Sequence, residues 1–154
     1  MSAWKRSASE DTLTALIIEV FRLNGCLLEA GDSLVGDMGL SSARWQVLGA
    51  IATTDTPLPV AHLARNMGLT RQAVQRIANE LERDGLIRFA PNPHHERAKL
   101  VLLTEAGSLA FGTAMRRQAP WAARLGKGLK PTELETTLRV VAHLRRRLED
   151  DPDL

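Results

Sequence analysis

The segment NPHHERAKLVLLTEAG, residues 92–107, holds the densest group of side chains with chemical potential in this chain. Adjacent His94, His95 and Glu96 are of types that bind metals or carry protons, and Arg97 is of a type that binds anions. A metal site needs three or four ligands converging on one ion, whereas neighbouring residues of an extended segment point apart. No nucleophile or glycine-rich phosphate loop accompanies the group. We therefore expect no enzymatic activity, no metal and no cofactor, and we interpret the segment as an exposed loop tip.

The composition is that of one globular domain, with 154 residues of which 44% are hydrophobic. No apolar run approaches the roughly 18–20 residues needed to span a bilayer, and the N-terminal MSAWKRSASEDT lacks the apolar core of a signal peptide. A single cysteine excludes an internal disulfide. We expect a cytoplasmic protein with no membrane partner. The formal net charge is only +2, so the positions of the charges matter more than their sum.

The strongest local pattern lies in residues 60–85, VAHLARNMGLTRQAVQRIANELERDG. A short helix should end at Gly68, since glycine tolerates positive φ, and Thr70 should cap a second helix that ends at Gly85. Two helices joined by so short a turn form a helix-turn-helix, whose second helix can enter the major groove of DNA.

The outward face of that second helix supports DNA binding over an ordinary corner between two helices. It carries Arg, Gln and Asn side chains, which are the types that pair with guanine and adenine edges. The predicted contact residues on and beside this helix are Thr70, Arg71, Gln72, Gln75, Arg76 and Asn79.

Two β-prone stretches, residues 86–91 and 98–103, flank the polar segment that contains the histidines. They predict a β-hairpin directly after the recognition helix, which is the order of elements in a winged helix. The tip of such a wing lies beside the minor groove, where arginine reads groove shape and lysine holds phosphate.

Helices are predicted on both sides of this unit. The first runs over residues 7–31, with the capping pair Ser7 and Glu10 at its start and Gly31 as its stop. A second begins at Ser41 or Ser42. After the hairpin, a helix covers residues 105–125, and a last helix begins at the Thr132 to Glu135 capping pair. The fold class is therefore mainly α with a small β-hairpin wing: a winged helix-turn-helix with N- and C-terminal helices. We expect these helices to serve dimerisation, because a long apolar stripe on a terminal helix has too little to bury within one small chain.

These segments resemble the multiple-antibiotic-resistance regulator (MarR) family of bacterial transcription factors. The matching pieces are SSARWQVLGAI, VAHLARNMGLT, VQRIANELERDGLI and the wing segment NPHHERAKLVLLTEAG. The family wing typically reads D-P-x-D-x-R-A, then V-x-L-T-x-x-G, and seven residues fit it: Pro93, Arg97, Ala98, Val101, Leu103, Thr104 and Gly107. Asn92 and His95 stand where aspartates are usual.

The resemblance implies a set of roles for residues of the wing and the flanking helices. Arg97 would enter the minor groove, with His94, His95 and Lys99 beside it on the wing. An aspartate usually orients the wing arginine, and histidine in its place would do so less strongly. Trp45 either lines an effector cavity or packs in the core, and a small aromatic or phenolic effector would release the DNA.

Cys26 lies near the end of the first helix, and some family members sense peroxide through such a thiol. Those sensors surround the sulfur with tyrosines, which this chain lacks. We therefore favour a small, partly buried packing residue at this position over a redox site.

The predicted function is a homodimeric, DNA-binding transcriptional repressor that recognises a near-palindromic operator. The whole chain, 1–154, forms one MarR-like domain, with the winged helix-turn-helix at 40–104 and the dimerisation helices at 7–31 and 105–149. Two alternatives stay open. One is a redox-responsive regulator that acts through Cys26, and the other is a helical dimer that acts through protein contacts without specific DNA binding.

Overall fold

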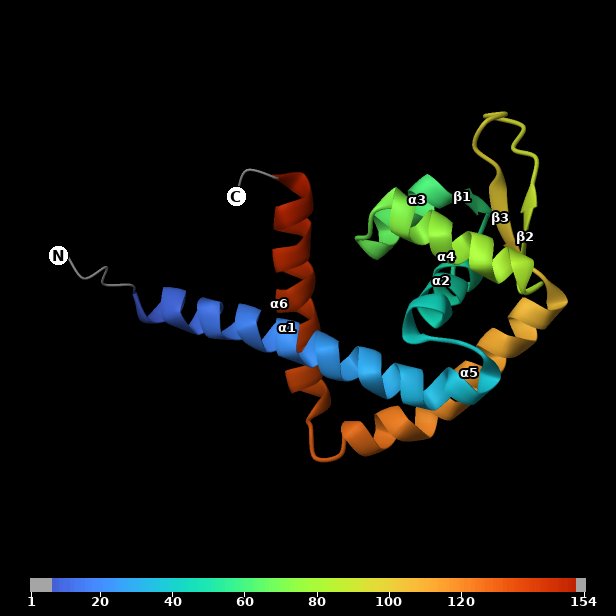
Figure 1. Cartoon of the computed structure of the whole chain (residues 1–154). Coiled ribbons are helices and arrows are strands. Elements are labelled where there is room, and N and C mark those ends of the chain that lie inside the picture. Colours follow the sequence, from blue (N-terminus) through green and yellow to red (C-terminus); the bar gives the residue numbers. More distant parts are fainter. Residues whose placement is uncertain (1–6, 152–154) are drawn as a thin grey trace. The chain divides into compact units, whose positions relative to one another are not determined.

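The structure is a computed structural model of the chain, and it describes residues 7–151 (Figure 1). It opens with helix α1, Ala8–Val35, whose start is the predicted capping box. The Ser7 side chain accepts a hydrogen bond from the Glu10 amide, and the Glu10 carboxylate accepts one from the Ser7 amide. Both amides would otherwise lack a partner at the helix end, so the sequence fixes where α1 begins.

The predicted stop of this helix at Gly31 is wrong, because α1 continues for another turn. Gly31 is buried, and a Cβ built on it would lie 2.0 Å from Ser42 Oγ. The glycine therefore allows the start of the next helix to approach α1. Ser42 completes this contact by donating its hydroxyl to the Leu28 carbonyl at 2.8 Å and its amide to Asp32 at 2.6 Å.

A 3₁₀ turn, η1 (Gly36–Met38), and Gly39 at φ 70° lead into helix α2, Ser42–Ala52. Ser41 caps α2 by accepting from the Arg44 amide at 3.2 Å. Asp37 of η1 is held by Arg117, which donates to both carboxylate oxygens and to the Leu34 carbonyl. The hydrogen bond from the Arg117 guanidinium lowers the pKa of Asp37, and the same contact raises the pKa of Arg117.

Helices α3 (Val60–Met67) and α4 (Arg71–Arg83) form the predicted helix-turn-helix. Gly68 ends α3 at φ 65°, and the Thr70 hydroxyl caps α4 by accepting from the Ala73 amide at 3.2 Å. Gly85, at φ 75°, follows α4 and lets the chain reverse into the sheet. These three residues carry out the roles that their types predict.

The wing comprises β2 (Ile87–Ala90), β3 (Leu100–Leu103) and the residues between them, and β2 and β3 pair antiparallel. A third strand, β1 (Leu58–Pro59), pairs with the other edge of β3, giving the order β1-β3-β2. The predicted two-stranded hairpin is thus a three-stranded sheet. Figure 1 shows the hairpin projecting beyond the helices, with β1 on the side of α3.

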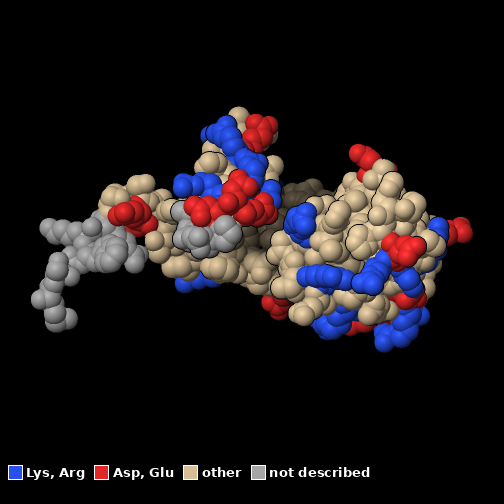
Figure 2. Space-filling view, turned by 90° about the horizontal axis from the view of Figure 1, so that it is seen from above, with Lys and Arg blue, Asp and Glu red and all other residues tan. Residues whose placement is uncertain are grey.

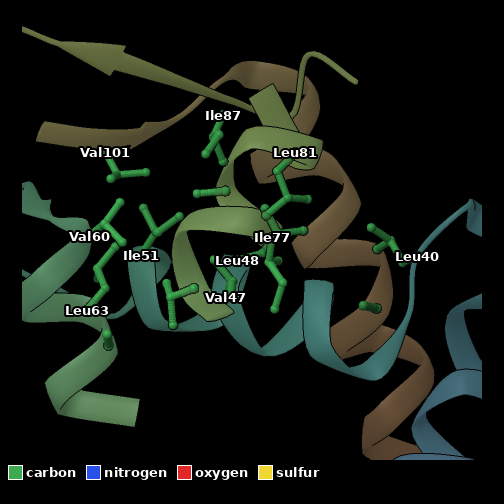
Figure 3. Packing of buried hydrophobic residues seen from close by; sticks show 14 of the residues in the cluster. Leu40, Val47, Leu48, Ile51, Val60, Leu63, Ile77, Leu81, Ile87 and Val101 are labelled. Carbon is green, nitrogen blue, oxygen red and sulfur yellow. The ribbon is translucent and has the colours of Figure 1, made fainter. Parts of the chain in front are cut away.

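The hydrophobic core joins α2, α3, α4 and the sheet. Leu48, Leu63, Leu81, Ile87 and Val101 are almost completely buried, and each comes from a different one of these elements or strands. Figure 3 shows these side chains converging. Since such packing has few alternatives of equal density, it fixes the orientation of α4 and therefore decides which of its side chains face outward.

Helix α5, Glu105–Leu125, follows the sheet, and helix α6, Pro131–Asp150, ends the described chain. Contacts divide the chain after Arg117 into two compact units. The predicted capping pair of α6 is wrong by two residues. Lys130 is the cap, Pro131 occupies the first helical position, and the Glu133 carboxylate accepts from the Lys130 amide at 3.0 Å. Among the described residues, no helix is long and apolar enough to cross a membrane.

Candidate nucleic-acid interface

The face of α4 turned away from the core is polar along its whole length. Arg71, Gln72, Arg76 and Asn79 are exposed and Gln75 is half-buried, whereas Val74, Ile77, Ala78 and Leu81 are buried. This division follows from the helical period, because residues three and four apart share one face. The predicted contact residues on α4 therefore all lie on one side of the helix, and Thr70 caps its start.

Two side-chain contacts order this face. Gln75 donates its amide to Asn79 Oδ1 at 2.8 Å, one helical turn further on. Arg76 lies 3.7 Å from Glu80 and is 74% exposed. An ion pair this long and this exposed contributes little to stability, so its loss on binding would cost little. Arg71, in the first turn, takes part in no ion pair within residues 7–151.

A groove of about 1060 Å³ connects α4 to the wing and to the start of α3. We call it the α4–wing groove. Its lining includes side chains from three elements that are distant in sequence: Arg71, Gln75, Asn79 and Glu82 from α4; His62 from α3; and Asn92, His94, His95, Arg97 and Lys99 from the wing. Gln72 and Arg76 line a second hollow, along α4, together with Arg83. The fold thus brings the predicted residues of helix and wing onto one surface.

The charges on this surface are predominantly basic. Arg71, Arg97 and Lys99 face the α4–wing groove, and Glu82 is its only acidic side chain among the described residues. Figure 2 looks onto the face from which the wing projects in Figure 1, and it shows blue Lys and Arg side chains across the part at the right of the view, with red Asp and Glu side chains between them and at its edges. A cationic groove of this kind attracts a polyanion even though the whole chain is nearly neutral.

The wing tip is built from two consecutive turns that share His95. The Asn92 carbonyl accepts from the His95 amide at 3.2 Å, and the His95 carbonyl accepts from the Ala98 amide at 3.0 Å. The side chain of Asn92 joins the two turns, accepting from the His94 amide at 3.0 Å and donating to the Ala98 carbonyl at 2.9 Å. Arg97 lies in the second turn.

Arg97 is exposed, and within residues 7–151 it forms no ion pair. Its neighbour Glu96 does not substitute for the usual aspartate as an ion-pair partner. The guanidinium keeps all its donors available to an external anion. Sequence reasoning missed the role of Asn92, although an Asn followed by Pro is a common signal for a turn held by the Asn side chain.

The end of α4 is anchored to the rest of the unit by Arg44, which sequence reasoning also missed. Its guanidinium donates to the Gly39 carbonyl at 2.8 Å and to the Asp84 carboxylate, and its side chain is only 15% exposed. Hydrogen bonds from Arg83 and then Arg44 lower the pKa of Asp84. On the other side, the Thr104 hydroxyl donates to the Gly85 carbonyl at 2.7 Å. These contacts fix where α4 ends relative to the wing.

The two remaining predicted residues lie away from this surface. Trp45 is half-buried on α2 and packs against the hydrophobic core, and neither hollow described above includes it. Cys26 is exposed on α1, so its interpretation as a partly buried packing residue is wrong for the single chain. Every α1 residue from 17 to 29 is exposed, so Cys26 lies in a stretch of the helix that packs little within this chain. Within residues 7–151, no three His, Cys, Asp or Glu side chains are grouped as metal ligands.

Comparisons with known proteins agree with this architecture. A sequence model of the MarR family matches residues 38–98. An uncharacterised protein of Mycobacterium tuberculosis is 35% identical over 127 residues, covering 82% of this chain and 87% of its own. The transcriptional activatory protein BadR of Rhodopseudomonas palustris is 29% identical over 116 residues, covering 70% of this chain and 66% of BadR. A crystal structure of CouR from Rhodococcus jostii RHA1 bound to p-coumaroyl-CoA has the same fold, with a TM-score of 0.76 at 22% identity, over 91% of this chain and 95% of CouR.

Proposed function

The chain belongs to the MarR family of transcriptional regulators, and on that premise we propose that it binds double-stranded DNA as a homodimer through the α4–wing surface. The observation that carries this proposal is the groove that α4 and the wing line together. A recognition helix and a wing that face one groove can contact the major groove and the adjacent minor groove at the same time.

The exposed side chains of α4 make different contacts with DNA, according to their chemistry. Gln72, Gln75 and Arg76 read base edges, because a glutamine amide pairs with adenine and an arginine fork with guanine. Arg71, at the first turn of α4, contacts phosphate, as does Thr70 through its backbone. Asn79 sets the orientation of the Gln75 amide through their hydrogen bond.

The wing contributes shape recognition and charge. Arg97 enters the minor groove, where narrow A·T-rich segments concentrate negative potential. His94, His95 and Lys99 line the α4–wing groove. In the complex these three side chains contact the phosphate backbone of the DNA. Phosphate contacts supply much of the affinity, so binding weakens steeply as salt rises.

Dimerisation involves the apolar face of α1 together with α5 and α6. On α1, the side chains of Ile17, Phe21 and Leu23 are 45%, 72% and 51% exposed, and on α6 Leu138 is 70% exposed. Monomeric proteins rarely expose so many large apolar side chains, and a twofold copy offers a matching surface. The two recognition helices then lie about 34 Å apart, or one turn of DNA.

The regulatory response follows from the same dimer. We infer that a small aromatic or phenolic molecule binds beside Trp45 and favours a spacing of the recognition helices that does not fit DNA. CouR, which shares the fold, binds p-coumaroyl-CoA in its crystal structure.

Without the effector, the dimer stays on the DNA and represses by occupying the promoter. A reporter under the chain's own upstream DNA should be expressed more strongly when the protein is absent, and weaker expression would mean activation instead.

The DNA-binding proposal is tested by removing single side chains from the proposed interface. Gln75→Ala and Arg97→Ala should each weaken binding to the chain's own upstream DNA by about 1–3 kcal/mol, or roughly 5- to 150-fold in Kd. Arg22→Ala is the matched control, because Arg22 is an exposed α1 cation that pairs only weakly with Glu19 at 3.6 Å. Wild-type affinity in both interface variants would overturn the proposal.

A further inference from the structure

Within residues 7–151 the Arg97 guanidinium forms no ion pair, so the orientation of this side chain depends on the backbone turn that carries it. Its backbone is constrained by the hydrogen bond between the His95 carbonyl and the Ala98 amide. That turn contains no glycine, and no described residue other than glycine has positive φ. The turn is therefore unstrained, but a single hydrogen bond in water would leave it mobile.

Asn92 supplies the missing constraint. Its side chain accepts from the His94 amide in the first turn and donates to the Ala98 carbonyl at the end of the second. The amide group is half-buried and reaches across six residues, whereas the tip residues from His94 to Arg97 are exposed. Both functional atoms of one side chain are used, one as an acceptor and one as a donor.

We infer that Asn92 is a positioning residue for DNA binding, which holds the two turns of the wing tip together so that Arg97 is presented toward DNA in one orientation. The inference rests on the proposed function, and Asn92 itself touches no DNA. The Asn92 side chain stabilises the bound form of the wing before DNA arrives, which lowers the ordering cost of binding.

In this chain the clamp uses a donor, so it needs an amide at the position where the family wing usually has an aspartate. An aspartate at position 92 has nearly the same shape and still accepts from the His94 amide, but an ionised carboxylate cannot donate to the Ala98 carbonyl. Asn92→Asp therefore breaks one of the two contacts and adds charge, whereas Asn92→Ala removes both contacts and adds none. Comparing the two separates lost positioning from repulsion between the new charge and phosphate.

The deciding experiment is a double-mutant cycle with Arg97. In the wild-type background, Asn92→Ala should raise Kd for operator DNA about fivefold or more. In the Arg97→Ala background, Asn92→Ala should change Kd by less than about twofold, because nothing remains for the clamp to position. Equal effects in the two backgrounds would overturn the inference, as would an effect of Asn92→Asp with none of Asn92→Ala.

A measurement without DNA separates this inference from the proposed function. Trypsin under native conditions should cleave after Arg97 faster in Asn92→Ala and in Asn92→Asp than in the wild type. Cleavage after Lys127, in the linker between α5 and α6, should not change and serves as the internal control. Unchanged cleavage after Arg97 would overturn the clamp. The cleavage could be faster in the variants while the wild-type protein shows no preference for any DNA sequence. That result would uphold the clamp at the wing tip and overturn the DNA-binding role of Asn92 and Arg97.

Discussion

Replacing Gly107 with alanine should destabilise the protein markedly, although alanine is the better helix former. Gly107 is buried in the first turn of α5, and a Cβ built on it would lie 1.9 Å from the carbonyl oxygen of Leu86 and 2.9 Å from its carbonyl carbon. The neighbour is main chain rather than a flexible side chain. Leu86 directly follows Gly85, which comes just after α4, so the substitution pushes the start of α5 away from the end of α4.

The size of the effect follows from this geometry. To restore ordinary van der Waals contact, α5 or the Leu86 peptide must move by about 1.5 Å. Overpacking a well-packed site costs about 1–3 kcal/mol, and a backbone neighbour places the cost near the upper value. The gain in helix propensity returns at most about 1 kcal/mol. The net loss is about 2 kcal/mol, which lowers Tm by about 4–8 °C in a chain of this length.

Gly112 offers a matched control in the same helix. A Cβ there would meet only the end of the Arg116 side chain at 3.5 Å, an ordinary contact. Gly112→Ala should therefore raise the unfolding free energy by about 0.5–1 kcal/mol. Thermal unfolding followed by circular dichroism measures both variants. Equal Tm values for Gly107→Ala and Gly112→Ala would refute the close approach of α5 to Leu86.

Three further predictions concern ionisation, charge and backbone conformation. Arg117 lowers the folded-state pKa of Asp37, so the ionised carboxylate stabilises the fold at pH values above the unfolded pKa of about 3.8 and loses this effect as pH falls through the folded pKa. Asp37→Asn should therefore lower Tm at neutral pH, and the difference from the wild type should vanish in acid. A difference in Tm that does not depend on pH would exclude the ion pair. Lys99→Ala should reduce the slope of log Kd against log salt by about 0.9 per lost phosphate contact, and an unchanged slope would remove Lys99 from the interface. Gly68→Ala places a Cβ on a residue at φ 65° and should lower the free energy of unfolding by about 1 kcal/mol, measured as a Tm about 2–4 °C lower. An unchanged Tm would mean that the turn between α3 and α4 relaxes without strain.

The helix-turn-helix was predictable because its signals are local. Gly68, Thr70 and Gly85 each act on the backbone within a few residues of their own position, and the helical period alone sorts α4 into a buried and an exposed face. The residues that share the exposed face of α4 can therefore be predicted from residue types and spacing. The wing strands are also recognisable, because β-prone runs flank a polar turn.

The features that the sequence did not reveal depend on contacts between distant residues. Gly31 has the type of a helix stop, but its role is to admit Ser42, eleven residues away. Strand β1 is two residues long and exists because Leu58 pairs with Val101. Arg44 anchors Asp84 across forty residues. No local pattern encodes such partners, so the anchoring of α4 emerged only from the folded chain.

The start of α6 shows a different reason for error. Thr132 and Glu135 have the spacing of a capping box, yet the helix begins two residues earlier. Pro131 has a fixed φ that suits the first position of a helix, and Glu133 reaches back to the Lys130 amide. Two overlapping start signals compete here. The one that contains Pro131 prevails because proline has no backbone N–H that would need a hydrogen-bond partner at the start of the helix.

The central claim is that α4 and the wing together recognise a particular DNA sequence. The most direct measurement is a fluorescence anisotropy titration of the wild-type protein at physiological salt. It compares a duplex from the region upstream of the chain's own gene with a duplex of the same composition in shuffled order. The account predicts binding to the upstream duplex at least about a thousandfold tighter, which is the lower end of the preference expected of a specific regulator. Equal affinity for the two duplexes would contradict it.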